Sequence, residues 1–343
     1  MDNRTREFFA SGLTVAIFLA VQLGALALVK PFKTAGYQTV SDPSDPTNSL
    51  VYIGVILVFT AGMLVVIKLG VQWILRAVII LTSGMISLYV FSVVIPAVVT
   101  VTVSDSQVNV LAWVFAALVS LALAVYPEWY VIDAAGVLMG AGSAGLFGIS
   151  FGLLPAILLL TVLAVYDAIS VYGTEHMLTL ASGVMDLKIP VILVIPLSLS
   201  YSFLEDAVQA TSEGAVSEND DELVGDGDGE FDDSESLGEA VGDEGEANRD
   251  AFFIGLGDAV MPTVMVASAA FFSPANALLS GIALNLPALT AMIGTIAGLL
   301  VLLWMVMKGR AHAGLPLLNG GAIGGYLVGA LASGIPLMKA LGL

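Results

Sequence analysis

The chain has 343 residues, of which 58% are hydrophobic, and its mean hydropathy is +0.96. Soluble domains are about 45–50% apolar, so this composition, spread over runs of about 20 residues, excludes a soluble globular domain and indicates a polytopic membrane protein. The chain has no cysteine, which excludes disulfides and thiolate catalysis, and its two histidines, His176 and His312, argue against a histidine-rich metal site. We therefore expect neither a metal nor another cofactor.

The formal charge of −18 belongs to one segment of the chain. Residues 204–250 contain 18 of the 29 acidic residues and one base, Arg249, which leaves 11 acids and 10 bases elsewhere. The segment is rich in Asp, Glu, Gly and Ser and poor in large apolar residues, a composition typical of disorder. We expect a solvated linker there, between an N-terminal membrane part, residues 1–203, and a C-terminal membrane part, residues 251–343.

Nine apolar runs are each long enough to cross a bilayer as a helix, which takes about 20 residues. Helices are required because lipid offers the backbone no hydrogen-bond partners. The sequence therefore predicts an all-α membrane protein, a bundle of nine transmembrane helices. The runs cover residues 8–29, 50–69, 75–100, 108–126, 129–149, 152–172, 252–272, 281–307 and 315–338.

Two stretches between the runs have distinct characters. Residues 30–49 are rich in Pro, Ser and Asp and read as a polar loop. Residues 191–203, "VILVIPLSLSYSF", are apolar but too short to span, so we expect an amphipathic segment at the membrane interface or a re-entrant piece.

Lysine and arginine set the expected orientation in the cell membrane. A cytoplasmic N-terminus puts eight bases inside and three outside, with the 204–250 linker inside and the C-terminus outside. Lys30 and Lys33 would lie outside and oppose this orientation, but the total count of bases inside and outside favours it. The inside set is Arg4, Arg6, Lys68, Arg76, Lys188, Arg249, Lys308 and Arg310, and the outside set is Lys30, Lys33 and Lys339.

Three carboxylates fall within the runs: Asp133, Asp167 and Asp258. An ionised side chain in the bilayer costs at least about 2.5–3.5 kcal/mol, so each suggests a functional site. Asp133 lies only a few residues into the fifth run, where it could reach the interface. Asp167 lies toward the cytoplasmic end of the sixth run, and Asp258 lies about two turns into the seventh from the same side. The last two are therefore expected at similar depth in neighbouring helices.

Two carboxylates at one depth can share one proton, because two close like charges cannot both ionise cheaply. The ionised one can then deprotonate a water while its protonated partner polarises a peptide carbonyl, as in aspartic proteases. Two other interpretations stay open for Asp167 and Asp258. They could form a proton or ion relay, or they could hydrogen-bond neighbouring helices for assembly.

The neighbours of these acids are consistent with a site. Gly255 and Gly257 lower helix propensity and permit close backbone approach, although ordinary helix packing would use them too. Tyr166 could donate a hydrogen bond or shape the pocket. The stretch "HAGLPLLNGGAIGGY" (312–326) places Pro316 in the first turn of the ninth run, and the residues before a proline favour an extended backbone.

Such an extended segment has backbone donors and acceptors that could pair with an unwound substrate strand. The helix that follows it carries glycines that are expected to form one small-residue packing face. They are Gly320, Gly321, Gly324 and Gly325.

Together these residues resemble the presenilin and signal-peptide-peptidase family of intramembrane aspartyl proteases. Tyr166–Asp167 resembles the family's Tyr-Asp motif. Gly255-Leu256-Gly257-Asp258 resembles its Gly-x-Gly-Asp motif, and Gly314-Leu315-Pro316 resembles the end of its Pro-Ala-Leu-Pro motif. Nine spans with a long linker after the sixth also match, and the chain is most similar to an archaeal presenilin homologue. The family pattern has Pro and Ala where this chain has Ala313 and Gly314.

The resemblance implies that Asp167 and Asp258 form a catalytic dyad that hydrolyses transmembrane helices, with residues 314–316 positioning the substrate. The expected partners are transmembrane-helix substrates and lipid, with a homo-oligomer possible, and neither nucleic acid nor obligatory subunits are inferred. A second "PAL", at 287–289, lies inside the eighth run and is read as coincidence.

Other classes remain as alternatives. An ion- or proton-coupled secondary transporter would also use membrane acids and Gly-interrupted helices, but no repeat between the halves is evident. A non-catalytic scaffold leaves two deep aspartates unexplained, and a prepilin-peptidase-like enzyme fits the motif placement less well.

Overall fold

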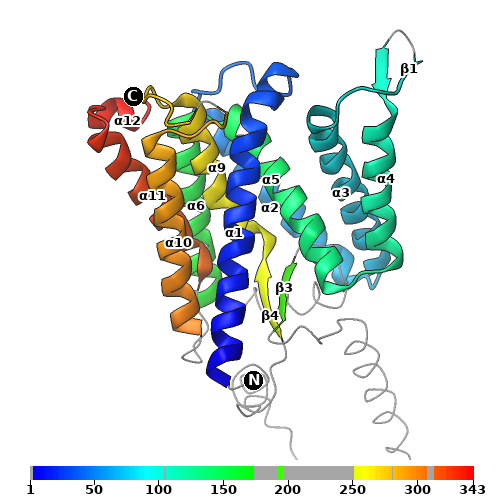
Figure 1. Cartoon of the computed structure of the whole chain (residues 1–343). Coiled ribbons are helices and arrows are strands. Elements are labelled where there is room, and N and C mark those ends of the chain that lie inside the picture. The colour runs from blue at the N-terminus through cyan, green and yellow to red at the C-terminus, as the bar shows by residue number, and fades with distance from the viewer. Residues whose placement is uncertain (1–2, 104–105, 174–191, 197–250, 280, 307–312) are drawn as a thin grey trace, which may run out of the picture.

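A computed structural model describes residues 3–103, 106–173, 192–196, 251–279, 281–306 and 313–343. Its described part is mostly helical, with two short antiparallel hairpins (Figure 1). The helices, labelled as in Figure 1, are α1 (Asn3–Thr34), α2 (Thr47–Lys68), α3 (Gln72–Val94), α4 (Val110–Val125), α5 (Trp129–Ser150), α6 (Leu153–Gly173), α9 (Leu256–Phe272), α10 (Leu286–Val306), α11 (Gly314–Ala332) and α12 (Leu337–Ala340). The strands are β1 (Thr100–Val103), β2 (Ser106–Asn109), β3 (Ile192–Pro196) and β4 (Ala251–Gly255).

The helices agree with the nine predicted spans. Seven of them are long and apolar enough to cross a membrane, and two shorter apolar helices, α4 and α9, correspond to the fourth and seventh spans. The chain is therefore a membrane-embedded, multi-span helical protein. The predicted linker, residues 204–250, lies outside the described residues.

Several predicted ends were wrong, each for a local reason. The third span ends at Val94, not at residue 100, because Ile95 is extended before Pro96. The ninth ends at Ala332, not at residue 338, and Gly334 follows with a φ of +77°. The first continues through Pro31 to Thr34, beyond the predicted end at residue 29.

The eighth span begins at Leu286 and not at residue 281. Asn285 caps this helix, because its Oδ1 accepts a hydrogen bond from the Ala288 N–H at 2.9 Å. Its Nδ2 donates to the carbonyl oxygen of Ala269 at 2.9 Å, which ties the start of α10 to α9.

The seventh span also begins late, because residues 251–255 form strand β4 and not the start of a helix. The described part of the 191–203 segment pairs with it: residues 192–196 form β3, in antiparallel register with Val194 opposite Phe253. Leu193, Val194 and Ile195 are buried in the protein. Over these residues the expected interfacial or re-entrant segment takes the form of a buried strand, which suits its β-branched residues.

Helix α9 lies at the centre of the bundle, in contact with α1, α5, α6, α10 and α11. Helices α10 and α11 pack closely, because Gly294 and Gly298 of α10 approach the backbone of α11. The predicted glycine face of α11 is half right. Gly321 and Gly325 lie against the α10 backbone, whereas a Cβ on Gly320 or Gly324 would meet no atom within 4 Å.

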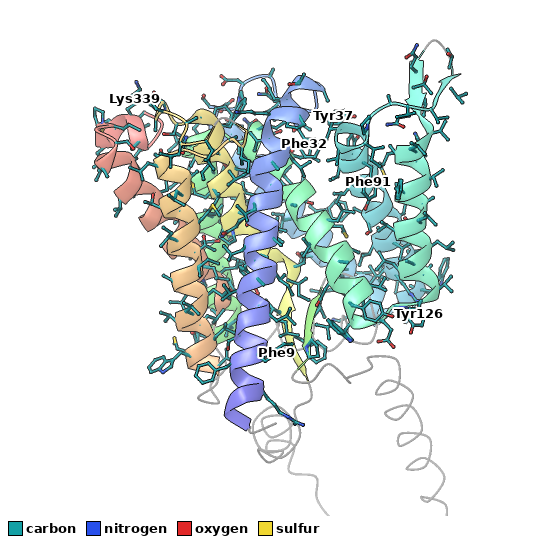
Figure 2. The ribbon with its side chains drawn as sticks, in the orientation of Figure 1. Phe9, Phe32, Tyr37, Phe91, Tyr126 and Lys339 are labelled. Carbon is teal, nitrogen blue, oxygen red and sulfur yellow. The ribbon has the colours of Figure 1, made fainter. Side chains whose placement is uncertain are left out.

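The two ends of the bundle differ. Figure 1 shows the N-terminus at the lower end, with β3 and β4 near it, and the C-terminus and α12 at the upper end. At the upper end Tyr37 packs on Phe32 and Tyr89, with ring centroids 5.9 and 5.0 Å apart, and its hydroxyl is 2.9 Å from the Ser92 hydroxyl (Figure 2). These contacts join the end of α1 to α3.

Candidate active site

Asp167 lies in the C-terminal third of α6, and only 4% of its surface is exposed. Its Oδ2 accepts a hydrogen bond from the backbone N–H of Leu315 at 3.1 Å. A buried carboxylate within a membrane helix needs such a partner, because an unpaired one is costly there. Asp167 is thus held against the beginning of α11.

Asp258 lies in the first turn of α9, three residues after the N-cap Gly255, and is half-buried. It was expected about two turns into this helix, and the difference arises because residues 252–255 are a strand. Its carboxylate accepts a hydrogen bond from the Gly255 N–H. An acid at this position that reaches back to the N-cap N–H is one half of a capping box, and the helix dipole favours a carboxylate there.

The first residues of α11 bring the two aspartates to one place. While Leu315 donates to Asp167, a Cβ built on Gly314 would lie 3.5 Å from Asp258 Oδ1. The two carboxylates are also close enough to interact electrostatically. Three helices that are far apart in sequence, α6, α9 and α11, therefore meet at this point.

Pro316 is in the first turn of α11, where its missing N–H leaves no helical hydrogen bond broken. The expectation of an extended backbone before Pro316 is corrected for Gly314 and Leu315, which are already helical, whereas Ala313, the first described residue of this segment, is extended. The Leu315 N–H is also already used by Asp167. A Cβ at position 314 would make ordinary contact with Asp258 Oδ1 at 3.5 Å, so this turn lies directly beside the Asp258 carboxylate.

Tyr172 is a site residue that the sequence analysis missed. Its hydroxyl accepts a hydrogen bond from the Ala313 N–H at 3.3 Å, so α6 holds the beginning of α11 at two points. Its spacing gave no signal, since five residues place Tyr172 about 140° around the helix from Asp167. Tyr166, which was expected to shape the pocket, is 43% exposed, in contrast to the buried Asp167 beside it.

Asp133 does not join this pair of carboxylates. It lies near the N-terminus of α5, is buried, and accepts a hydrogen bond from the Val194 N–H of β3 at 2.8 Å. It is therefore buried within the protein, against β3.

Two carboxylates that lie close together are an arrangement in which one can act as base and the other as acid. Non-helical backbone is tolerated at membrane depth only where protein buries it or where it lines a water-filled cavity. The β4 strand that leads directly into Asp258 is non-helical backbone. The fold and the site thus define the class of membrane-embedded aspartyl hydrolases.

Comparisons with known proteins give the same class. The family model described as "Signal-peptide peptidase, presenilin aspartyl protease" matches residues 15–335. Two solved structures of a presenilin family intramembrane aspartate protease, in C222 and P2 space groups, are similar to this chain. The first is 34% identical with a TM-score of 0.60, covering 93% of this chain and 97% of that one. The second is 32% identical with a TM-score of 0.56, covering 93% and 96%. A comparison with curated proteins gave no match.

The chain belongs to the signal-peptide peptidase and presenilin family of aspartyl proteases. It is an intramembrane aspartic endopeptidase that acts on membrane-protein substrates in the bilayer. The comparisons give no support to the alternative of a secondary transporter.

Proposed function

We propose that Asp167 and Asp258 are the catalytic pair of this protease. The observation that carries the proposal is the position of the α11 start. Leu315 donates to Asp167 Oδ2 at 3.1 Å, while the neighbouring Gly314 lies beside Asp258 Oδ1. Both carboxylates therefore lie next to the same stretch of backbone.

The chemistry follows from a shared proton. The ionised carboxylate takes a proton from a water molecule, whose oxygen attacks the peptide carbonyl carbon, while the protonated carboxylic acid gives its proton to the carbonyl oxygen. The tetrahedral intermediate then collapses, the C–N bond breaks, and a proton passes to the leaving nitrogen. The products are a carboxylic acid and an amine.

Substrate positioning is assigned to Gly314, Leu315 and Pro316. A peptide bond in a helix is shielded by its own hydrogen bonds, so the substrate must unwind before it reaches the dyad. The first turn of α11 lies beside both carboxylates, which is where an unwound substrate backbone has to be held. The motif neighbours Gly255 and Gly257 are both exposed, which keeps side chains out of the approach to Asp258.

The test uses the purified chain and a single-span substrate whose helix is weakened by Gly or Pro. We compare wild type with Asp167→Asn and Asp258→Asn, and we use Asp45→Asn, an exposed loop aspartate, as the control. We expect cleavage within the span by wild type and the control, at sites read by mass spectrometry, and a loss of at least about 1000-fold in both dyad variants. Equal cleavage by all four proteins would refute the dyad. Activity of the purified chain would also support our proposal that no partner subunit is obligatory.

We further propose that the N-terminus is cytoplasmic in the cell membrane, with the C-terminus outside. The distribution of Lys and Arg supports this orientation, and the two ends of the chain lie at opposite ends of the bundle (Figure 1). Because the chain has no cysteine, single cysteines report on sidedness. With a membrane-impermeant thiol reagent on intact cells, we expect labelling of Ser44→Cys and not of Leu69→Cys. The reverse pattern would contradict the orientation.

A further inference from the structure

Asp133 is a buried carboxylate that the hydrolytic step does not use. It lies one turn into α5, its exposed fraction is 7%, and its Oδ1 accepts the Val194 N–H at 2.8 Å. Its Oδ2 has no hydrogen-bond partner in the part of the chain that the structure describes. A buried carboxyl group in a membrane helix is costly unless it is hydrogen-bonded, so the bond from the Val194 N–H ties β3 to α5.

The hydrogen-bond partner of Asp133 lies in β3, and β3 pairs with β4, the strand that leads into Asp258. In an antiparallel pair, residues that exchange backbone hydrogen bonds alternate with residues that do not. The Val194 N–H donates to Asp133. Val194 and the opposite residue Phe253 are therefore a pair that does not exchange backbone hydrogen bonds. The pair Ile192 and Gly255, two residues along, is then of the same kind, and the Gly255 N–H points away from β3.

The Gly255 N–H, which points away from β3, donates a hydrogen bond to the Asp258 carboxylate. The two-stranded sheet is therefore held at its two edges by carboxylates. Asp133 accepts a hydrogen bond from the Val194 N–H on the outer edge of β3. Asp258 accepts one from the Gly255 N–H on the outer edge of β4, immediately before α9 begins. Figure 1 shows β3 near the N-terminal end of α5, and β4 running to the start of α9.

The same face of α5 supports the active-site motif directly. Gly136, one turn after Asp133, lies so close to β3 that a Cβ there would be 2.8 Å from Leu193 Cδ2. A Cβ on Gly140, a further turn on, would be 3.3 Å from Cδ1 of Leu256, which directly follows Gly255. Helix α5 thus lies behind the strand pair and the first turn of α9.

We infer that Asp133 is a positioning residue: by fixing β3 through Val194, it sets the place of β4 and hence of Asp258 relative to Asp167. The inference rests on the proposed catalytic role of Asp258. What this role requires of Asp133 is a hydrogen-bond acceptor of the right shape. It does not require an ionisable group, and this distinguishes positioning from proton transfer.

The experiment compares cleavage by the full chain and its variants. Asp133→Leu removes the acceptor and is expected to lower kcat by about 10- to 100-fold, because a displacement near 1 Å costs up to about 100-fold. Asp133→Asn keeps a carbonyl oxygen and is expected to stay within about threefold of wild type. KM should change less than kcat, and Asp133→Leu should also alter the distribution of cleavage sites.

A second variant cuts the same hydrogen bond from its other side. Because the Val194 N–H points away from β4, Val194→Pro removes the donor to Asp133 and leaves the ladder intact. It is expected to lose activity as Asp133→Leu does, and it decides the question if Asp133→Leu does not fold. Ser268→Ala is the matched control, since it removes a buried 2.8 Å hydrogen bond to the Phe151 carbonyl far from the site.

Two results would overturn the inference. Asp133→Asn as inactive as Asp133→Leu would mean that the carboxylic acid itself is needed. Full activity in Asp133→Leu or in Val194→Pro would mean that this hydrogen bond does not position the strand. Asp258→Asn, measured beside them, separates the two proposals, because activity in that variant would defeat the dyad and not only the role of Asp133.

Discussion

The contact between α10 and α11 predicts opposite results for two adjacent glycines. A Cβ on Gly321 would fall on the carbonyl oxygen of Gly294 and lie 2.9 Å from its carbonyl carbon, whereas a Cβ on Gly320 would meet no atom within 4 Å. Ordinary contact begins near 3.4 Å, so Gly321→Ala must separate the helices by at least 0.5 Å, the difference between 2.9 and 3.4 Å. Overpacking of this kind costs about 1–3 kcal/mol.

The separation should also reach the site. Leu315 is six residues before Gly321, about 9 Å along the helix axis, and its N–H holds Asp167. Because a 1 Å misplacement can cost about 100-fold in rate, we expect Gly321→Ala to lower kcat on the order of 10-fold. Gly320→Ala should be neutral or slightly stabilising, since alanine exceeds glycine in helix propensity by about 1 kcal/mol.

The assay is the thermal unfolding midpoint of each purified variant in one detergent, together with the rate of cleavage of one single-span substrate. Gly321→Ala should unfold several degrees below wild type, and Gly320→Ala at or above it. If the two variants matched each other in stability and rate, the reasoning from backbone contact would be refuted.

Two further predictions concern the start of α11. Tyr172→Phe removes the hydroxyl that accepts a hydrogen bond from the Ala313 N–H. Because the Tyr172 side chain is exposed and the bond is long, we expect only a severalfold loss of cleavage rate, in keeping with a net hydrogen-bond contribution of about 0.5–1.5 kcal/mol. An inactive variant would mean that the hydroxyl has a larger role. Gly314→Ala introduces the alanine of the family pattern. Its methyl group would lie 3.5 Å from Asp258 Oδ1, which is ordinary contact, so near-normal cleavage is expected. A loss of cleavage rate above about 10-fold would contradict this geometry.

Much of the candidate site could be predicted from the sequence alone. Asp167 and Asp258 were singled out because carboxylates are costly inside apolar runs, and that cost is visible without a structure. Gly314 was singled out because Gly314-Leu315-Pro316 resembles a motif of the family. The number of spans followed in the same way, since about 20 apolar residues are needed to cross a bilayer. The structure brings these residues together at the start of α11.

Other features depended on which segments meet in space. Residues 252–255 looked like the beginning of a helix, yet they form β4, because Ile192–Pro196 is available as a partner strand from beyond the linker. A run of apolar residues reads the same in a buried strand as in a helix.

The glycines of α11 show the same limit, since Gly321 meets α10 and Gly320 does not, and only the rotation of the packed helix distinguishes them. The role of Asp133 was equally hidden. Composition and hydropathy identified a carboxylate near the membrane boundary, but its partner is a backbone N–H that lies 61 residues away in sequence. Local sequence therefore determined which residues are exceptional in a membrane, and tertiary packing decided which backbone groups they hold.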